Sequence, residues 1–278
     1  MGYRSMLLFL DSGASCARRT QAAIRLARRM DGHLVGLAPT GLLDLPGSVE
    51  GAAAFSNLAA LAWDQLRDEA ERAADTFRQS CRQAGLPGVD SKVDEQDPAI
   101  SVIAHAHCSD IVLLSQADPA APDHRAARQL VEQVVLYSAR PTLLLPYAGA
   151  TEPLGQRVLV AWDDSREAAR AVGDALPLLK GASSVQVVHW RPLAASRGDA
   201  GGLEAVRRWL SRHGVAAEVR VEPASIDIAD AMLSHAADLG TDLIVMGAYG
   251  HSRWTERVLG GATRGLLQSM TVPVLMSH

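Results

Sequence analysis

Short apolar runs alternate along this chain with longer segments that carry apolar residues at helical spacing. In the second half, the apolar runs predict strands at residues 158–162, 185–190, 217–221, 243–246 and 272–276. The segments between them predict helices at residues 165–179, 203–213, 228–239 and roughly 262–269. Strands that are apolar throughout and alternate with helices are typical of a parallel sheet covered on both faces. We therefore expect an α/β fold with doubly wound parallel sheets.

The second half of the chain repeats the first. The stretch "SDIVLLSQAD" at residues 109–118 aligns with "TDLIVMGAYG" at residues 241–250, at an offset of 132 residues. At the same offset, "ARPTLLLP" at residues 139–146 falls on "TVPVLMSH" at residues 271–278. Each of these last two stretches ends its half with an apolar strand, and a bare apolar edge strand invites pairing. We predict that the two final strands pair antiparallel.

The start of each half is marked by an aspartate after an apolar run. Asp11 in "MLLFLDSGAS" stands opposite Asp163 in "RVLVAWDDSRE", at an offset of 152 residues. The change from 152 to 132 means that the first half carries about twenty extra residues, which we place within residues 40–65. We expect two domains, residues 1–148 and 155–278, joined by a segment rich in glycine, proline and polar residues.

Composition and charge exclude several classes of protein. Hydrophobic residues make up 48% of the 278 residues and the net charge is −4, so the chain is globular and has no bulk positive field for nucleic acid or anionic lipid. The basic stretch at residues 18–29 is most simply the solvated face of an amphipathic helix. The apolar run at residues 6–10 is too short for a signal or a membrane span. Three cysteines without metal spacing fit a reducing cytoplasm: Cys16, Cys81 and Cys108.

Four glycines in "GAYGHSRWTERVLGG" follow the fourth predicted strand of the second half. Gly247 and Gly250 come directly after this strand, Gly260 and Gly261 precede the next helix, and Asp163 follows the first strand. Ligands of open parallel sheets bind beyond the carboxyl ends of the strands. Glycines permit a positive φ and a close ligand approach, and a helix N-terminus favours an anion by roughly 0.3–1 kcal/mol. The pattern predicts a phosphate chain at this edge.

The glycine spacing resembles the G-x2-G-x9-G-[ST] nucleotide motif of the universal stress protein family, and "VLVAWDDS" resembles the first strand of that family. The resemblance covers nearly the whole chain as a tandem pair of Rossmann-like domains, and it implies an intramolecular pseudo-dimer. It implies a stress-response or regulatory protein that binds ATP, with Mg²⁺, in its C-terminal domain. Asp163 and the backbone at Trp190 would hold adenine and ribose. The phosphates would lie against the glycine loop and the helix that follows: Gly247, Gly250, Gly260, Gly261, Ala262 and Thr263.

The chain departs from the family motif in both halves. Gly261 stands where the family has Ser or Thr, which removes a hydroxyl contact to phosphate or metal, although Thr263 and Arg264 are near enough in sequence to compensate. In the first half every glycine position carries a side chain, so we expect no nucleotide there. Because Asp118 stands opposite Gly250, Gly250→Asp is expected to abolish binding and to leave the fold intact. The residues opposite the four glycines are Ser115, Asp118, Arg128 and Gln129.

Other conspicuous residues allow a plain and a functional interpretation. His251 could reach a phosphate or act as a base, but a loop histidine is usually solvated. His105 and His107 look like metal ligands, yet side chains two residues apart on a helix point away from each other, so we expect no metal. A tryptophan could stack on adenine, although buried packing is its commoner role. The tryptophans near the predicted site are Trp162, Trp190 and Trp254.

Three function classes fit this sequence. The leading one is a non-enzymatic regulatory protein that binds ATP, and the second is an enzyme that hydrolyses ATP or transfers a nucleotidyl group. Phosphoryl transfer usually needs a lysine, metal carboxylates and a positioned water, but the chain has no G-x4-G-K-[ST] loop and its only lysines are Lys92 and Lys180. The third class is a scaffold that binds no nucleotide and presents a surface or an apolar pocket to a partner. A homodimer is compatible with all three.

Overall fold

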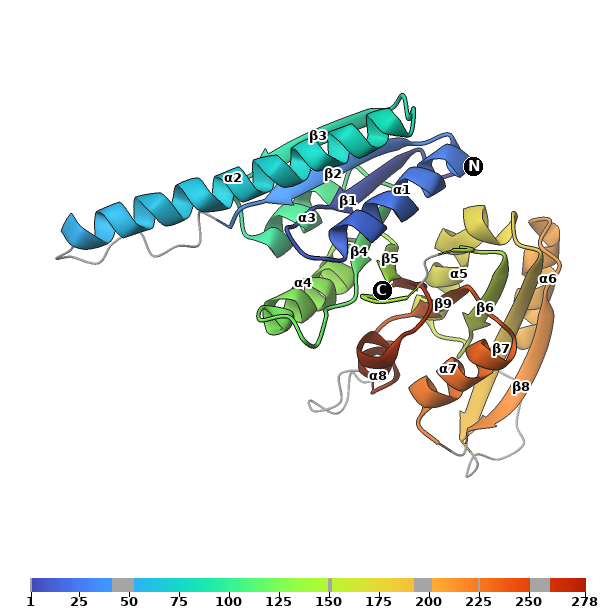
Figure 1. Ribbon diagram of the computed structural model, residues 1–278. Coiled ribbons are helices and arrows are strands. Elements are labelled where there is room, and N and C mark those ends of the chain that lie inside the picture. Colours follow the sequence, from blue (N-terminus) through green and yellow to red (C-terminus); the bar gives the residue numbers. More distant parts are fainter. Residues whose placement is uncertain (1, 42–52, 150–151, 193–201, 225, 251–260) are drawn as a thin grey trace. The chain divides into compact units, whose positions relative to one another are not determined.

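The computed structural model describes residues 2–41, 53–149, 152–192, 202–224, 226–250 and 261–278 (Figure 1). The chain divides into two compact units, Gly2–Leu114 and Ser115–His278. Each unit contains a largely parallel sheet with helices packed against it, so the predicted α/β fold is confirmed.

The first unit has the strand order β3-β2-β1-β4, and these strands are all parallel. Its helix α2 has 31 residues, against 10 in the corresponding helix α6 of the second unit, so the extra residues of the first half lengthen this helix (Figure 1). Within the described residues, no helix is both long and apolar enough to cross a membrane. The elements, of which β4 ends one residue beyond the unit, are β1 (Ser5–Phe9), α1 (Cys16–Met30), β2 (His33–Pro39), α2 (Ala53–Gln83), β3 (Val89–Asp94), α3 (Pro98–Ala106) and β4 (Ile111–Ser115).

The second unit has the strand order β5-β10-β9-β6-β7-β8. The predicted strands and helices of the second half are all present, with ends within three residues of the expected positions. The elements are α4 (His124–Tyr137), β5 (Thr142–Leu145), β6 (Arg157–Ala161), α5 (Arg166–Leu179), β7 (Ser184–Pro192), α6 (Leu203–Arg212), β8 (Glu218–Ala224), α7 (Ile228–Asp238), β9 (Leu243–Gly247), α8 (Gly261–Ser269) and β10 (Val274–Ser277).

The final strands of the two repeats pair with each other. Strands β5 and β10 run antiparallel, with Leu144 opposite Val274 and Leu143 opposite Leu275. These four side chains are fully buried, so each strand covers an apolar edge of the other. The predicted antiparallel pairing is confirmed. Because β5 pairs with β10 and α4 contacts β10, the end of the first repeat packs within the second unit. The expected domain limits of 1–148 and 155–278 stay a prediction.

Strand β6 lies between β7 and β9, so the chain leaves β6 on one side and returns to pair with it on the other side. Such a reversal of strand order opens a crevice beyond the carboxyl ends of the strands. The crevice of the second unit is therefore expected beyond Ala161 and Gly247, the last residues of β6 and β9.

Candidate functional site

A cavity of about 250 Å³ lies at this crevice. One part of its wall is apolar and comes from the strand ends and from α7: Ala161, Trp162, Trp190, Ile228, Met232 and Met246. The other part is formed by Asp163, by the loop after β9 and by the first turn of α8: Asp163, Gly247, Tyr249, Gly250, Gly261, Ala262 and Thr263. The structure thus gathers all but one of the predicted site residues around a single cavity. Gly260, together with His251 and Trp254, lies outside the described residues.

Asp163 is exposed at the mouth of the cavity and held in place by the start of α5. Its Oδ1 accepts hydrogen bonds from the Ser165 backbone nitrogen, at 3.1 Å, and from Ser165 Oγ, at 2.5 Å. Ser165 Oγ in turn accepts from the Ala168 backbone nitrogen, at 3.1 Å, and so caps α5. A fixed, solvent-facing carboxylate of this kind can accept further hydrogen bonds from ligand hydroxyl groups.

Two indole rings form the apolar wall. Trp162 and Trp190 each line the cavity and are each only 8% exposed, so both also belong to the core. Trp190 packs edge-on against His235, with ring centroids 5.9 Å apart. His189 Nδ1 lies 2.9 Å from the carbonyl oxygen of Trp162. These two tryptophans therefore pack in the core and also line the cavity.

Gly247 is required by packing between the strand and a helix. A Cβ at this position would lie 2.5 Å from the Ala168 backbone nitrogen and 2.6 Å from the Glu167 carbonyl carbon, both in the first turn of α5. Its φ is not in the left-handed region, whereas Tyr249, two residues further on, has a φ of 58°. Of the two reasons for a glycine given by the sequence, a positive φ does not apply at Gly247, and close packing against α5 accounts for the residue.

Gly250 faces a carboxylate that the sequence analysis did not predict at this position. A Cβ on Gly250 would lie 3.0 Å from Glu167 Oε2, and Glu167 is 4% exposed and paired with Arg166. Burial raises the pKa of Glu167, but the hydrogen bond and charge of Arg166, a backbone hydrogen bond and the nearby His278 outweigh it and hold the pKa below its usual value. Gly250→Asp would bring two carboxylates together. That this substitution abolishes binding and leaves the fold intact stays a prediction.

The first turn of α8 forms an exposed part of the cavity wall. Gly261 is exposed, and among the described residues no atom lies within 4 Å of where its Cβ would be. Thr263 is buried, and its Oγ1 accepts a hydrogen bond from the Tyr249 backbone nitrogen at 3.2 Å, so this oxygen already joins α8 to the loop. Arg264 is exposed. Backbone N–H groups in a first helical turn lack intrahelical partners, so this turn can meet an anion.

In the first unit, the aspartate that corresponds to Asp163 is bound by an arginine. Arg19 Nη2 lies 2.8 Å from Asp11 Oδ2, and Arg19 Nε donates to the Phe9 carbonyl oxygen at 2.8 Å. The Arg19 side chain is 1% exposed, so the interpretation of residues 18–29 as a solvated face was wrong for this residue. The protein itself compensates the charge of Asp11. That the first half holds no nucleotide stays a prediction.

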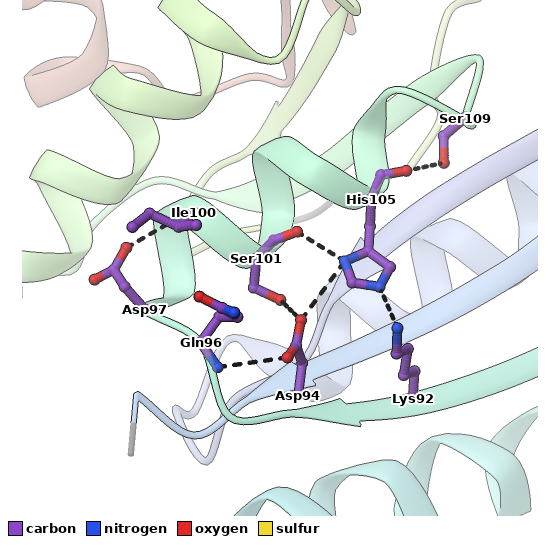
Figure 2. A network of polar contacts seen from close by, with 8 residues as sticks. All are labelled: Lys92, Asp94, Gln96, Asp97, Ile100, Ser101, His105 and Ser109. Atoms are coloured by element: carbon purple, nitrogen blue, oxygen red, sulfur yellow. Dashed lines mark hydrogen bonds and ion pairs between the residues drawn. The ribbon is translucent and has the colours of Figure 1, made fainter. Parts of the chain in front are cut away.

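His105, from the metal-like histidine pair, belongs to a hydrogen-bonded network between β3 and α3 (Figure 2). Its Nε2 lies 2.8 Å from Lys92 Nζ, and its Nδ1 lies 2.8 Å from the Ser101 carbonyl oxygen and 3.8 Å from Asp94 Oδ2. Ser101 Oγ donates to Asp94 Oδ2 at 2.6 Å. In the parts of the chain that the structure describes, no three His, Cys, Asp or Glu side chains form a metal-binding group.

Comparison with known proteins connects this geometry to a family. Residues 155–278 match the model of the Universal stress protein family. The whole chain resembles the crystal structure of a universal stress protein from Archaeoglobus fulgidus DSM 4304, with a TM-score of 0.73, 18% identity and coverage of 98% of this chain and 95% of that chain. It also resembles a functionally unknown protein from Pseudomonas aeruginosa PAO1, with a TM-score of 0.61, 15% identity and coverage of 99% and 92%. At these identities the structural likeness concerns the fold. No curated protein matches the chain.

Two buried threonines provide a test of the link between α8 and the loop. Thr142 Oγ1 is buried and has no hydrogen-bond partner among the described residues, so Thr142→Val should leave the free energy of unfolding unchanged or raise it by about 1 kcal/mol. Thr263→Val removes the acceptor of the Tyr249 N–H and should lower the free energy of unfolding by about 1–2 kcal/mol. Urea denaturation of both variants measures the difference. Equal stability of the two variants would contradict the assigned role of Thr263.

The Asp94 network should stabilise the fold only above acidic pH. Burial raises the pKa of Asp94, but hydrogen bonds from Ser101 and the Gln96 amide and the charges of His105 and Lys92 outweigh it and lower the pKa. A carboxyl whose pKa falls on folding stabilises the protein above its unfolded pKa of about 3.9, and this contribution is lost as the pH drops through the folded pKa.

We therefore expect Asp94→Asn to lower the midpoint of urea denaturation at pH 7, and the gap to the wild type to narrow below about pH 4. Asp68→Asn, at an exposed position of α2, removes the same charge and serves as the control. A gap that stays constant down to pH 2.5 would show that the carboxylate charge of Asp94 does not contribute.

Proposed function

We propose that the second half of the chain binds ATP in the cavity beyond β6 and β9, and that the chain is a stress-response or regulatory protein whose state depends on that nucleotide. The match of residues 155–278 to the model of the Universal stress protein family supports this proposal. One observation carries the proposal. A single cavity at the reversal of strand order combines an apolar wall with two indole rings, the fixed carboxylate of Asp163 and the open first turn of α8.

These three features match the three parts of an adenine nucleotide. The base would lie against the apolar wall that includes Trp162 and Trp190, where an aromatic ring gains from burial and stacking. The ribose hydroxyls would donate to Asp163. The phosphates would lie at Gly261 and the first turn of α8, away from the negative Glu167 beside Gly250. Mg²⁺ would arrive with the phosphates and be held mainly by phosphate and water oxygens.

Binding without catalysis is part of the proposal. In the described residues no lysine lines the cavity, since Lys92 lies beside His105 in the first unit and Lys180 follows the last turn of α5. Without a charge-neutralising lysine or fixed metal carboxylates, the site has little that would stabilise a transition state more than bound ATP. The three free cysteines suit the reducing, nucleotide-rich cytoplasm in which we place the protein. With a net charge of −4, nucleic acid is not a proposed partner.

Gly261 allows a test of the phosphate position that leaves the core untouched. Gly261→Asp introduces a negative charge at the start of α8, where it favours the helix and opposes phosphate, and the new side chain enters open space. We expect the wild type to bind ATP with a Kd below about 1 mM, and Gly261→Asp to bind at least about tenfold more weakly, which is ~1.4 kcal/mol. Calorimetry measures both values.

Gly261→Asn is the control, because it adds nearly the same volume without the charge and should bind close to the wild-type level. Gly261→Ser restores a hydroxyl and should tighten binding by up to about tenfold, the worth of one additional hydrogen bond. Equal affinities for the Asp and Asn variants would move the phosphates away from α8. A wild type that shows no heat at millimolar ATP would favour the scaffold that binds no nucleotide.

Phosphate release tests whether the protein is an enzyme. With Mg²⁺ and saturating ATP, we expect turnover far below the usual enzyme range of ~1–10³ per second. His251 is the base that the sequence suggests, so His251→Ala is the matched variant. Turnover within the usual range that is lost in His251→Ala would identify an ATP-hydrolysing enzyme instead.

A further inference from the structure

The second unit contains another cavity, of about 300 Å³. It is separate from the cavity beyond β6 and β9 that is proposed for ATP, which we call the nucleotide cavity. It lies between the segment that follows β4, the N-terminal half of α4 and the end of α8, and Ala117, Val131 and Leu267 contribute to its apolar wall. None of its lining residues also lines the nucleotide cavity.

The internal repeat explains why this space is open. At the offset of 132 residues, Ala117 is the counterpart of Tyr249, and α4 is the counterpart of α8. Tyr249 places its hydroxyl in a buried position beside Glu132 and Arg128 of α4 and Arg264 of α8. Burial first, and then the charge of Glu132, raises the pKa of this phenol to about 12. In the first repeat the methyl group of Ala117 stands at this position, and it lines the second cavity.

Gln116 joins two walls of the cavity by hydrogen bonds. This side chain is 3% exposed, and its Nε2 donates to the carbonyl oxygens of Leu267 and Gln268 at 3.1 and 3.0 Å. Its Oε1 accepts from the Tyr147 backbone nitrogen at 3.3 Å. The loop that carries Ala117 is therefore joined to the last turn of α8 by fixed bonds. The atoms that line an empty apolar cavity lack dispersion contacts on one side, and a ligand can supply these contacts.

The rim of the cavity carries a guanidinium and an imidazole. Arg128 and His124 are one helical turn apart on α4 and both line the space, and none of the described lining residues is acidic. Glu132 Oε1 lies 3.5 Å from Arg128 Nε, but this pair is partly exposed, so it holds the guanidinium only weakly. A guanidinium binds a carboxylate through two parallel hydrogen bonds, which an arginine in such a position can offer.

We propose that this cavity binds a small aromatic carboxylate, whose ring takes the volume that the Tyr249 side chain has in the other repeat and whose carboxylate meets Arg128 and His124. The cavity is distinct from the one proposed for ATP, because the two share no lining residue among those described.

The test uses phenylacetate and its neutral analogue phenylacetamide as probes, titrated against the full chain by calorimetry and ligand-observed NMR. Phenylacetate should bind with a Kd below about 1 mM, and phenylacetamide at least about tenfold more weakly. Arg128→Gln should weaken phenylacetate by about tenfold, because it removes the charged partner. Ala117→Tyr should abolish binding, because it restores the side chain of the other repeat and fills the space.

Two matched variants make the outcome decisive. Ala126→Tyr makes the same change at an exposed position of α4 and should bind phenylacetate like the wild type. Gly261→Asp should also bind it normally, whatever that variant does to ATP. No binding at 10 mM phenylacetate would overturn the proposal, as would equal binding by Ala117→Tyr with a wild-type melting temperature. Loss in Gly261→Asp but not in Ala117→Tyr would assign the probe to the nucleotide cavity and equally overturn it.

Discussion

At Gly247 the backbone of β9 passes so close to α5 that a single added Cβ would lie 2.5 Å from a helix amide nitrogen. This approach brings the loop after β9 beside the capped start of α5, where Ser165 orients Asp163 and Glu167 faces Gly250. The same loop reaches α8 through the hydrogen bond from the Tyr249 nitrogen to Thr263 Oγ1. Three segments far apart in sequence therefore meet around one cavity because one glycine removes the atom that would hold them apart.

The two repeats share one fold, but they carry different side chains at equivalent positions. In the second repeat, Asp163 is held by a helix cap and faces solvent, whereas its counterpart Asp11 is paired with the buried Arg19. The loops after β4 and β9 also differ. The second repeat carries the large side chain of Tyr249, whereas the first repeat carries Ala117 at the equivalent position, beside a cavity. Because equivalent positions differ in this way, the protein has two dissimilar cavities on one fold. Two identical domains would have two identical cavities instead.

Much of the fold and part of the candidate site follow from the sequence, because both depend on local pattern. Apolar runs and helical spacing predicted the elements of the second half, and the constant repeat offset predicted the antiparallel pair of β5 and β10. That the residues after β6 and β9 would line one cavity was predictable, because the ends of parallel strands share an edge. Glu167 and Arg19 were not, since their roles depend on which helix turn approaches which loop. The reason for a glycine at position 247 was missed for the same reason, because the sequence does not show that the backbone of α5 occupies the place of its Cβ.

The charges around the nucleotide cavity limit how strongly it can attract an anion. The lowered pKa keeps Glu167 ionised at neutral pH, and its carboxylate lies beside Gly250. Its partner Arg166 is 68% exposed, so salt and water screen the compensating charge. Against this, the N-terminus of α8 contributes roughly half an elementary positive charge. Under the proposed function, phosphate would gain from the helix while the glutamate opposes it, and the net attraction would stay modest. Under that proposal, a site balanced in this way would fill and empty as the nucleotide concentration changes, which is what a nucleotide-dependent regulator requires. Catalysis would require an additional attraction that arises only in the transition state.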